Sequence, residues 1–464
     1  MIRIIITFLL SFFLFVTSIF AQDITGDWYG QIDVQGSKLR ISFHVNEKDK
    51  TYATTMDSPD QMAFGIPTDE TIVLNNNITI SLKSMMIVFN GRLNKDIIKG
   101  TFSQGGMDFP LILSHKKITK EKKKPKFQEP TKPYPYKSEE ITFVNKKANN
   151  ITLSGTLTLP KNIKKPVVAI LISGSGPQNR DEEILDHKPF LVLADHLTNN
   201  GIAVLRYDDR GVAKSEGTQK NATSADFATD VEAAITYLQT RKDIDTSKIG
   251  LIGHSEGGLI APMVASNNNN VAFIVLLAGP GVNGAEVLKT QTKKAFELAG
   301  LTKKHIDFNN KVSEEIYNMV KIENDNNKLQ INIIDYLNEV KKVAPDSYAK
   351  ELTDTAIKIQ AKTISSPWMT YFIKTNPKEF LNQVNCPVLA INGSKDIQVI
   401  ADLNLSGINS ALKHNDDVTV KKLEGLNHLF QTCETGAVNE YAKIKETFSP
   451  KALQIISNWI NKRF

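Results

Sequence analysis

Two patterns of hydrophobic and polar residues divide the chain. Residues 22–115 contain short runs in which apolar and polar residues alternate, such as Leu39 to Val45 and Ile78 to Leu82, with Gly and Asn between the runs. Alternation with a period of two is typical of strands that bury one face and expose the other. This segment is therefore predicted to be a small all-β domain, either a barrel or a sandwich.

Residues 138–464 have a different pattern of apolar residues. Their β-branched runs are apolar throughout, which is expected of strands buried on both faces. Helical periods such as Phe190 to Leu197 and Ala225 to Leu238 lie between these runs, so the segment is predicted to be an α/β domain with a parallel sheet. The apolar runs are Val167 to Ile172, Ile202 to Leu205, Ile249 to Ile252, Val271 to Leu277 and Val388 to Ile391.

One interval of the α/β domain is too long for a single crossover helix. About 100 residues separate the apolar run that ends at Leu277 from the run that begins after Pro387. They read as amphipathic helices rich in Lys, Asn and Glu. We expect an insertion at about residues 282–380 that forms a helical cap above the ends of the strands.

Residues 116–137 are rich in Lys and Pro and are predicted to be an interdomain linker. Seven lysines and one glutamate between residues 116 and 126 account for the entire net charge of +6. A nucleic-acid-binding surface requires a basic patch on a folded face. A basic run in a linker does not meet that requirement, so no nucleic-acid partner is predicted.

The N-terminus indicates export. Arg3 precedes an almost unbroken apolar run from Ile4 to Val16, and residues 1–21 are predicted to be a signal peptide cleaved after Ala21. An uncleaved membrane anchor is the alternative. No other stretch is apolar enough to cross a bilayer, so no stable membrane insertion is expected of the mature protein.

Only two cysteines occur, Cys386 and Cys433. They are too few for a disulfide framework, and no metal-ligand spacing is present. Neither a metal nor a cofactor is predicted. Whether the two thiols pair is left open.

A serine nucleophile is predicted at Ser255. The motif Gly253-His254-Ser255-Glu256-Gly257 directly follows an apolar strand and opens a helix. In that context G-x-S-x-G is the strained turn that exposes a nucleophilic hydroxyl at a helix N-terminus. The alternative is a glycine-rich turn that serves only packing.

The serine hydroxyl needs a base. In hydrolases that carry G-x-S-x-G between a strand and a helix, the base follows the nucleophile along the chain. His305, His414 and His428 are the histidines after Ser255. His428 lies in a turn after the strand Val418 to Leu423, and we predict it to be the base. His305, in the cap, and His414, at the end of a polar helix, are expected to be surface residues.

The acid that orients the base is predicted to be Asp396. It follows the buried strand Pro387 to Asn392, at a carboxyl end of the sheet, as the nucleophile does. The competing carboxylates Asp402, Asp416 and Asp417 lie in a helix or a turn and are expected to be exposed.

The loop Ser173-Gly174-Ser175-Gly176-Pro177 ends another buried strand. The fold takes one oxyanion-binding N–H from this loop and the other from the residue after the nucleophile, so we assign the donors to Ser175 and Glu256. A phosphate-binding loop is the alternative, but its glycine spacing is not matched. The charged turn Arg206 to Gly211 is expected to form ion pairs and hydrogen bonds that fix this turn near the site, with acid–base catalysis by its two carboxylates as the alternative.

These motifs resemble those of a known family. The runs Gly174 to Asp181, Arg206 to Gly211 and Gly253 to Ser255 look like bacterial carboxylesterases of the α/β-hydrolase superfamily, near its prolyl-oligopeptidase and dienelactone-hydrolase branches. Asp396 and His428 fall where that family carries its acid and base. The resemblance implies hydrolysis of short-chain acyl esters of small-molecule substrates.

Two alternatives to an esterase remain at this stage. A serine peptidase of the prolyl-oligopeptidase type uses the same three residues, and a surface-binding protein with a non-catalytic hydrolase domain belongs to a different class. Within the cap, Trp368 and Tyr371 are candidates for substrate binding, with packing of the cap as the alternative. The sequence leaves the natural substrate and the oligomeric state open.

Overall fold

The structure of the protein is a computed structural model that describes residues 23–34, 37–48, 51–61, 63–85, 87–104, 107–119 and 126–464. The predicted signal peptide lies outside the described residues. The chain divides after Lys122 into two compact units. In the described part of the chain, no helix combines the length and the hydropathy that crossing a membrane requires.

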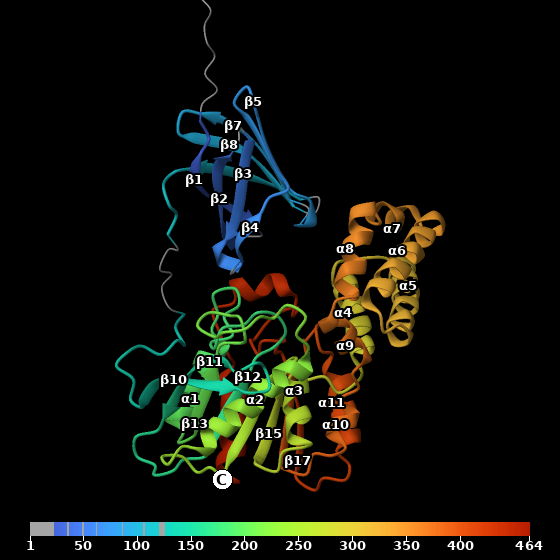
Figure 1. The fold of residues 1–464 in the computed structure, drawn as a ribbon. Coiled ribbons are helices and arrows are strands. Elements are labelled where there is room, and N and C mark those ends of the chain that lie inside the picture. Colours follow the sequence, from blue (N-terminus) through green and yellow to red (C-terminus); the bar gives the residue numbers. More distant parts are fainter. Residues whose placement is uncertain are drawn as a thin grey trace, which may run out of the picture. The chain divides into compact units, whose positions relative to one another are not determined.

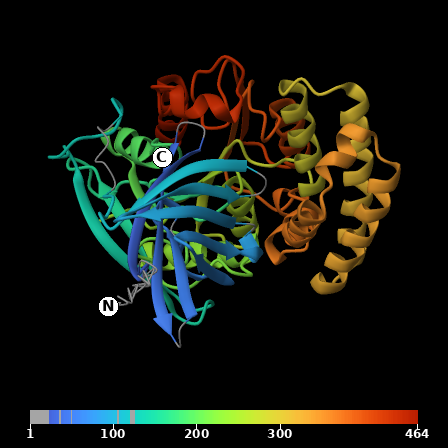
Figure 2. The same ribbon diagram turned by 90° about the horizontal axis from the view of Figure 1, so that it is seen from above.

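The first unit is built on one nine-stranded antiparallel sheet in the order β4-β3-β2-β1-β9-β8-β7-β6-β5. Its strands curl, as Figures 1 and 2 show, and β4 and β5 form the two edges. The strands are β1 (Gly26–Val34), β2 (Ser37–Lys48), β3 (Thr51–Ser58), β4 (Ala63–Pro67), β5 (Glu70–Leu74), β6 (Asn77–Leu82), β7 (Ile87–Asn94), β8 (Ile97–Gln104) and β9 (Met107–Ser114).

The alternating pattern explains the curl of this sheet. Every second side chain of the strands faces one apolar core, in which Trp28, Phe43, Phe89 and Phe102 are buried. The indole N–H of Trp28 donates a hydrogen bond of 2.8 Å to the carbonyl oxygen of Ile24. A single curled sheet around one core corresponds to an open barrel rather than to a sandwich.

The second unit contains an eight-stranded sheet in the order β10-β11-β13-β12-β14-β15-β16-β17. The strands from β13 to β17 in this order are parallel, whereas β10 and β11 are antiparallel to their neighbours. This is the α/β-hydrolase fold, in which the apolar runs form the predicted parallel strands. The strands are β10 (Lys137–Asn145), β11 (Ile151–Leu159), β12 (Val168–Ile172), β13 (Ala203–Tyr207), β14 (Ile249–His254), β15 (Val271–Leu277), β16 (Val388–Gly393) and β17 (Val418–Leu423).

Helices cover both faces of this sheet (Figure 1), which is why its central strands are apolar on both sides. One core lies between the sheet and α2 (Ser224–Gln239), α3 (Gly257–Ala265) and α11 (Ala401–Ala411). The other core lies on the opposite face, between the sheet and α1 (Pro189–Asn199) and α12 (Pro450–Asn461).

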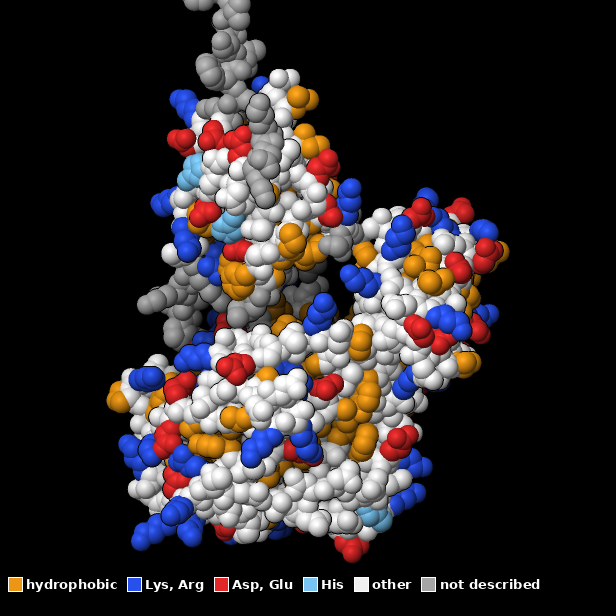
Figure 3. All heavy atoms as spheres, in the orientation of Figure 1, with side chains coloured by type: hydrophobic (Ala, Val, Ile, Leu, Met, Phe, Trp, Pro, Cys, Tyr) orange, Lys and Arg blue, Asp and Glu red, His pale blue; other side chains and the backbone are white. Residues whose placement is uncertain are grey.

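The cap is a helical insertion between β15 and β16, as predicted, and it has a core of its own. Its helices are α4 (Gly284–Leu298), α5 (Lys303–Ile322), α6 (Asn326–Val343), α7 (Asp346–Glu351), α8 (Asp354–Ile364), α9 (Pro367–Lys374) and α10 (Lys378–Leu381). Ile316, Val320, Leu329, Ile333 and Leu337 are buried in that core. On the face visible in Figure 3, the outer surface of these helices mixes charged side chains of both signs with apolar ones.

Part of the predicted linker is fixed to the second unit. Gln128 Oε1 accepts hydrogen bonds from the backbone N–H groups of Thr447 and Phe448, and its amide donates to the Phe448 carbonyl oxygen at 2.7 Å. The hydroxyl of Tyr136 donates to Asp195 at 2.8 Å. Residues 126–136 therefore have specific partners that their Pro-rich composition does not indicate.

Candidate active site

Ser255 occupies a sharp turn between β14 and α3. Its φ angle is +52°, in the left-handed region that non-glycine residues rarely adopt, and its N–H donates a hydrogen bond to the Leu277 carbonyl oxygen at 2.9 Å. The turn depends on its two glycines. A Cβ atom on Gly253 would lie 2.0 Å from the carbonyl oxygen of Gly257, and one on Gly257 would lie 2.1 Å from that of Ile172. Strain of this kind is typical of functional sites.

His428 and Asp396 meet at the carboxyl ends of β17 and β16. The Nδ1–H of His428 donates to Asp396 Oδ2 at 2.8 Å, and both side chains are almost fully buried. The other carboxylate oxygen, Oδ1, accepts the backbone N–H groups of Gln398 and Val399 at 2.8 and 2.9 Å. Asp396 is thus held at both oxygens, and its bond to Nδ1 leaves His428 Nε2 as the nitrogen that can accept a proton.

The hydroxyl of Ser255 makes no hydrogen bond with His428 within the described residues. The two residues are nevertheless linked through His254, which precedes Ser255 in the chain. Its ring centroid lies 4.8 Å from that of His428. Hydrogen bonds between nucleophile and base are often long before substrate binds, so this geometry is compatible with the predicted roles, which stay predictions.

The loop after β12 lies against the nucleophile. A Cβ atom on Gly174 would lie 3.2 Å from Cβ of Ser255. The N–H of Gly174 is engaged, because it donates to Glu182 Oε1 at 2.7 Å. In contrast, the N–H groups of Ser175 and Glu256 donate to no other residue in the part of the chain that the structure describes. They are therefore available to bind an oxyanion, which is the role predicted for them.

Glu182 and His254 form a buried pair beside Ser255 that the sequence did not indicate. His254 Nδ1 lies 2.8 Å from Glu182 Oε1, and His254 Nε2 lies 3.0 Å from the carbonyl oxygen of His428. Burial acts to lower the pKa of His254, but the negative charge of Glu182 and the hydrogen bonds outweigh it, so this pKa is raised. A carboxylate eight residues after Gly174 in an irregular loop gives no periodic signal.

The Glu256 side chain connects the nucleophile turn to the cap. Its Oε1 accepts the Ser224 hydroxyl at 2.6 Å and the indole N–H of Trp368, on α9, at 2.8 Å. Burial raises the pKa of Glu256, although these two hydrogen bonds act in the opposite direction. The Trp368 ring stacks on Phe372, with centroids 5.6 Å apart.

Tyr371, the second cap residue singled out from the sequence, has different surroundings. It packs against an apolar cluster in which α9 meets α3, and it is partly buried there. The buried members of the cluster are Leu259, Met263, Val287, Phe372 and Val399. These contacts are those of a residue that attaches the cap, which was the alternative to a substrate-binding role.

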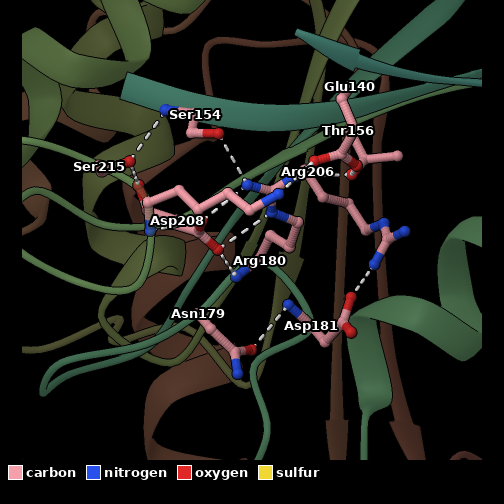
Figure 4. Close-up of polar contacts among 10 residues, drawn as sticks. Glu140, Ser154, Thr156, Asn179, Arg180, Asp181, Arg206, Asp208 and Ser215 are labelled. Atoms are coloured by element: carbon pink, nitrogen blue, oxygen red, sulfur yellow. Dashed lines mark hydrogen bonds and ion pairs between the residues drawn. The ribbon is translucent and has the colours of Figure 1, made fainter. Parts of the chain in front are cut away.

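The charged turn after β13 forms the predicted ion pairs. Figure 4 shows Arg180 directed at Asp208, which it contacts at 2.7 Å, and Arg206 paired with Asp181. The Arg180 guanidinium also donates to the side chains of Glu140, Ser154 and Thr156. The network fixes the loop that follows the predicted oxyanion residues onto β10 and β11.

Asp209, the next residue in this turn, holds the base of the same loop. It accepts the Ser173 hydroxyl at 2.6 Å and the Gln178 N–H at 3.0 Å. The pKa of Asp209 is raised to about 8, mainly by burial. The charges of Glu256 and Glu182 act in the same direction, and the two hydrogen bonds oppose them. Near neutral pH this carboxyl group is therefore mainly protonated.

His305 and His414 are the other histidines that follow Ser255 in the chain. His414 is exposed, as expected, but the expectation for His305 was wrong. His305 is buried in the cap, with its ring against Phe296 and Tyr348, because α5 turns its apolar face inward there. Cys386 and Cys433 are free thiols. Among the described residues, no group of three or more His, Cys, Asp or Glu side chains is arranged to bind a metal ion.

Several known proteins are similar to this chain. EstD, an esterase of Thermotoga maritima, is 25% identical over 313 residues, which cover 67% of this chain and 66% of the esterase, just under two thirds of its length. Among solved structures, the esterase Pf2001 of Pyrococcus furiosus is 17% identical, with 71% of this chain and 91% of the esterase covered and a TM-score of 0.42. Est1E of Butyrivibrio proteoclasticus, solved with ferulic acid bound, is 18% identical, with 69% and 96% covered and a TM-score of 0.39.

A family model gives the broader relationship. The model described as "Serine aminopeptidase, S33" matches residues 188–431. That segment is more than half of the 464 residues and includes Ser255, Asp396 and His428. The chain therefore belongs to the S33 serine aminopeptidase family of α/β-hydrolases.

Proposed function

We propose that this protein hydrolyses carboxylic esters, with Ser255 as nucleophile, His428 as base and Asp396 as the acid that orients the base. The observation that carries the proposal is the buried 2.8 Å hydrogen bond between His428 Nδ1 and Asp396 Oδ2, next to a serine held at a φ of +52°. A base oriented by a carboxylate and a strained, partly exposed nucleophile are the parts that acyl transfer requires.

The reaction follows from these positions. The Ser255 hydroxyl attacks the ester carbonyl carbon, and its proton passes to Nε2 of His428. The N–H groups of Glu256 and Ser175 bind the negative oxygen of the tetrahedral intermediate. The intermediate expels the alcohol, which takes the proton from His428 and leaves an acyl group on Ser255. Water, deprotonated by His428, then releases the acid and restores the serine.

The finer features of the proposal are a preference for short acyl chains, export after cleavage of residues 1–21, and a position near the prolyl-oligopeptidase and dienelactone-hydrolase branches. The motif Gly174 to Asp181 and the names of the similar proteins, several of them esterases, support an ester substrate. The apolar run near the N-terminus supports export.

Peptide hydrolysis is the second candidate, and the description of the family model favours it. The same three residues serve both reactions, so substrate decides between them. Purified protein should be assayed with p-nitrophenyl esters of increasing acyl length and with aminoacyl p-nitroanilides. We expect turnover of the C2 and C4 esters. Turnover of the anilides alone would contradict the ester proposal, and inactivity on both sets would favour a binding protein.

Trp368 and Tyr371 allow a test of the cap. If either side chain lines the acyl pocket, its replacement by alanine should change the preference among C2, C4 and C8 esters by about 10- to 200-fold, because one apolar contact contributes about that much discrimination. Its contact with Glu256 makes Trp368 the stronger candidate, and we expect Tyr371→Ala to act mainly on stability. The measurements are kcat/KM for the three esters and the melting temperature. If both variants melt at a lower temperature but keep the wild-type preference among the three esters, neither residue lines the substrate site.

The first unit supplies none of the predicted catalytic residues, so a chain that begins at Lys123 should retain turnover of small soluble esters. A chain that begins at Ser138 also lacks Gln128 and Tyr136, whose hydrogen bonds fix residues 126–136 to the second unit. We expect this shorter chain to melt at a lower temperature, which calorimetry can measure. A well-folded but inactive Lys123 chain would show that the first unit shapes the site.

A further inference from the structure

Both ring nitrogens of His254 face hydrogen-bond acceptors. Nδ1 lies 2.8 Å from Glu182 Oε1, and Nε2 lies 3.0 Å from the carbonyl oxygen of His428. A carbonyl oxygen only accepts, so Nε2 must carry a hydrogen, and a neutral imidazole has just one N–H. Where Glu182 is a carboxylate, Nδ1 donates as well, and two donated hydrogen bonds require the imidazolium form of His254.

The second contact of Glu182 fits the same assignment. The oxygen that faces His254 also accepts the N–H of Gly174 at 2.7 Å. An oxygen that accepts two hydrogen bonds is well satisfied as a carboxylate. The two side chains are only 7% and 5% exposed, so their charges are compensated by each other and by these hydrogen bonds. The raised pKa of His254 agrees with this arrangement.

The pair joins three segments that surround the nucleophile. Glu182 and Gly174 belong to the loop after β12, His254 ends β14 next to Ser255, and the His428 carbonyl lies in the loop after β17. Glu182 has a φ of +51°, a left-handed conformation that a non-glycine residue retains only where surrounding contacts impose it. The backbone thus adopts an unfavourable conformation at the residue whose carboxylate contacts His254.

We propose that Glu182 and His254 are positioning residues: a buried carboxylate–imidazolium pair that fixes the loop of the predicted base and the predicted oxyanion loop relative to Ser255. The inference rests on the proposed function. Neither side chain touches the reacting atoms. The imidazolium donates a hydrogen bond to the carbonyl oxygen of His428, and the carboxylate accepts the N–H of Gly174 beside Ser255. Both loops are therefore held in fixed positions relative to the Ser255 hydroxyl before substrate binds.

The protonation of His254 can be measured directly. The ionisable groups that face it are Glu182, Asp396 and His428, and the aromatic ring of Phe430 lies on its other side. We expect the nitrogen NMR shifts of His254, assigned by comparison with His254→Asn, to report two N–H groups from pH 6 to pH 8. In Glu182→Gln the compensating charge is gone, and His254 should become neutral within that range. A wild-type His254 with one N–H throughout would overturn the charge assignment.

Kinetics test the positioning role. Glu182→Gln should lower kcat for a p-nitrophenyl ester by about 100-fold with KM changed by less than about threefold, because a displacement on the order of 1 Å at a reacting group has effects of this size. His254→Asn should cause a similar loss. The double variant should be little slower than either single variant, since both act through one unit.

Asp230→Asn is the matched control. Asp230 is a buried carboxylate of α2, paired with Arg210 at 2.7 Å, and it contacts none of the predicted site residues. It should lower the melting temperature and leave kcat unchanged. A Glu182→Gln protein with wild-type kcat, or with a loss no greater than that of Asp230→Asn, would overturn the positioning role. A wild-type protein inactive on every ester would contradict the proposed function, whereas the NMR measurement would still decide the protonation of His254.

Discussion

Replacing Ser255 by alanine should reduce ester hydrolysis by a factor on the order of 10⁴ to 10⁶, because the members of such a triad act as a unit. The fold should be unaffected, since the hydroxyl makes no hydrogen bond to another described residue and the backbone turn is fixed by Gly253 and Gly257. Alanine also tolerates a positive φ about as poorly as serine does. The measurements are kcat for a p-nitrophenyl ester and the melting temperature.

A comparison with the base makes this prediction sharper. His428→Ala should lose a similar factor, and the Ser255→Ala, His428→Ala double variant should be little slower than either. A fluorophosphonate should label the wild-type protein at Ser255 alone. Residual activity near the wild-type level in Ser255→Ala, or labelling at another residue, would rule out the mechanism.

Asp396→Asn should lower kcat by about 10⁴-fold while the geometry of the site is kept, as expected when a triad base is held in the wrong tautomer. The asparagine carbonyl can retain the N–H groups of Gln398 and Val399, which now bind Oδ1. Its amide NH₂ would then face His428 and require an acceptor at Nδ1. The proton of His428 would move to Nε2, which could no longer accept the proton of Ser255.

Asp402 provides the control for this variant. It is an exposed carboxylate on α11 that pairs with Lys422. Asp402→Asn should leave kcat unchanged, because an exposed pair of this kind contributes little. A loss in Asp396→Asn as small as that in Asp402→Asn would mean that Asp396 does not orient the base.

The sequence was most informative where one physical requirement governs a whole segment. Strands buried on both faces must be apolar throughout, so β12 to β16 could be located from uninterrupted apolar runs. The turn at Ser255 could be predicted because Gly253 and Gly257 admit no side chain. His428 and Asp396 followed from their places after strands, and the structure brings those two side chains within 2.8 Å.

Contacts between distant loops could not be predicted in this way. Glu182 meets His254 across 72 positions of sequence, and Gln128 meets Phe448 across 320. Such pairs depend on where irregular segments cross in space, which no local period encodes. His305 was misjudged for a related reason. In an amphipathic helix rich in polar residues, a side chain is buried if it lies on the side that faces a neighbouring helix. The sequence did not indicate which helix would be the neighbour.

The attachment of the cap has a consequence for how this fold can diversify. The cap packs around a core separate from the two cores of the sheet, and it is inserted in the chain between β15 and β16. Such a module can be exchanged as a block between relatives. Besides the apolar cluster in which α9 meets α3, a polar contact constrains the exchange. The residue whose N–H is predicted to bind the oxyanion also accepts the indole N–H of Trp368 through its carboxylate. A grafted cap would therefore need a hydrogen-bond donor at the position of Trp368. Without one, the buried carboxylate of Glu256 would lose its second partner. With one, a new cap could bring new substrate preferences.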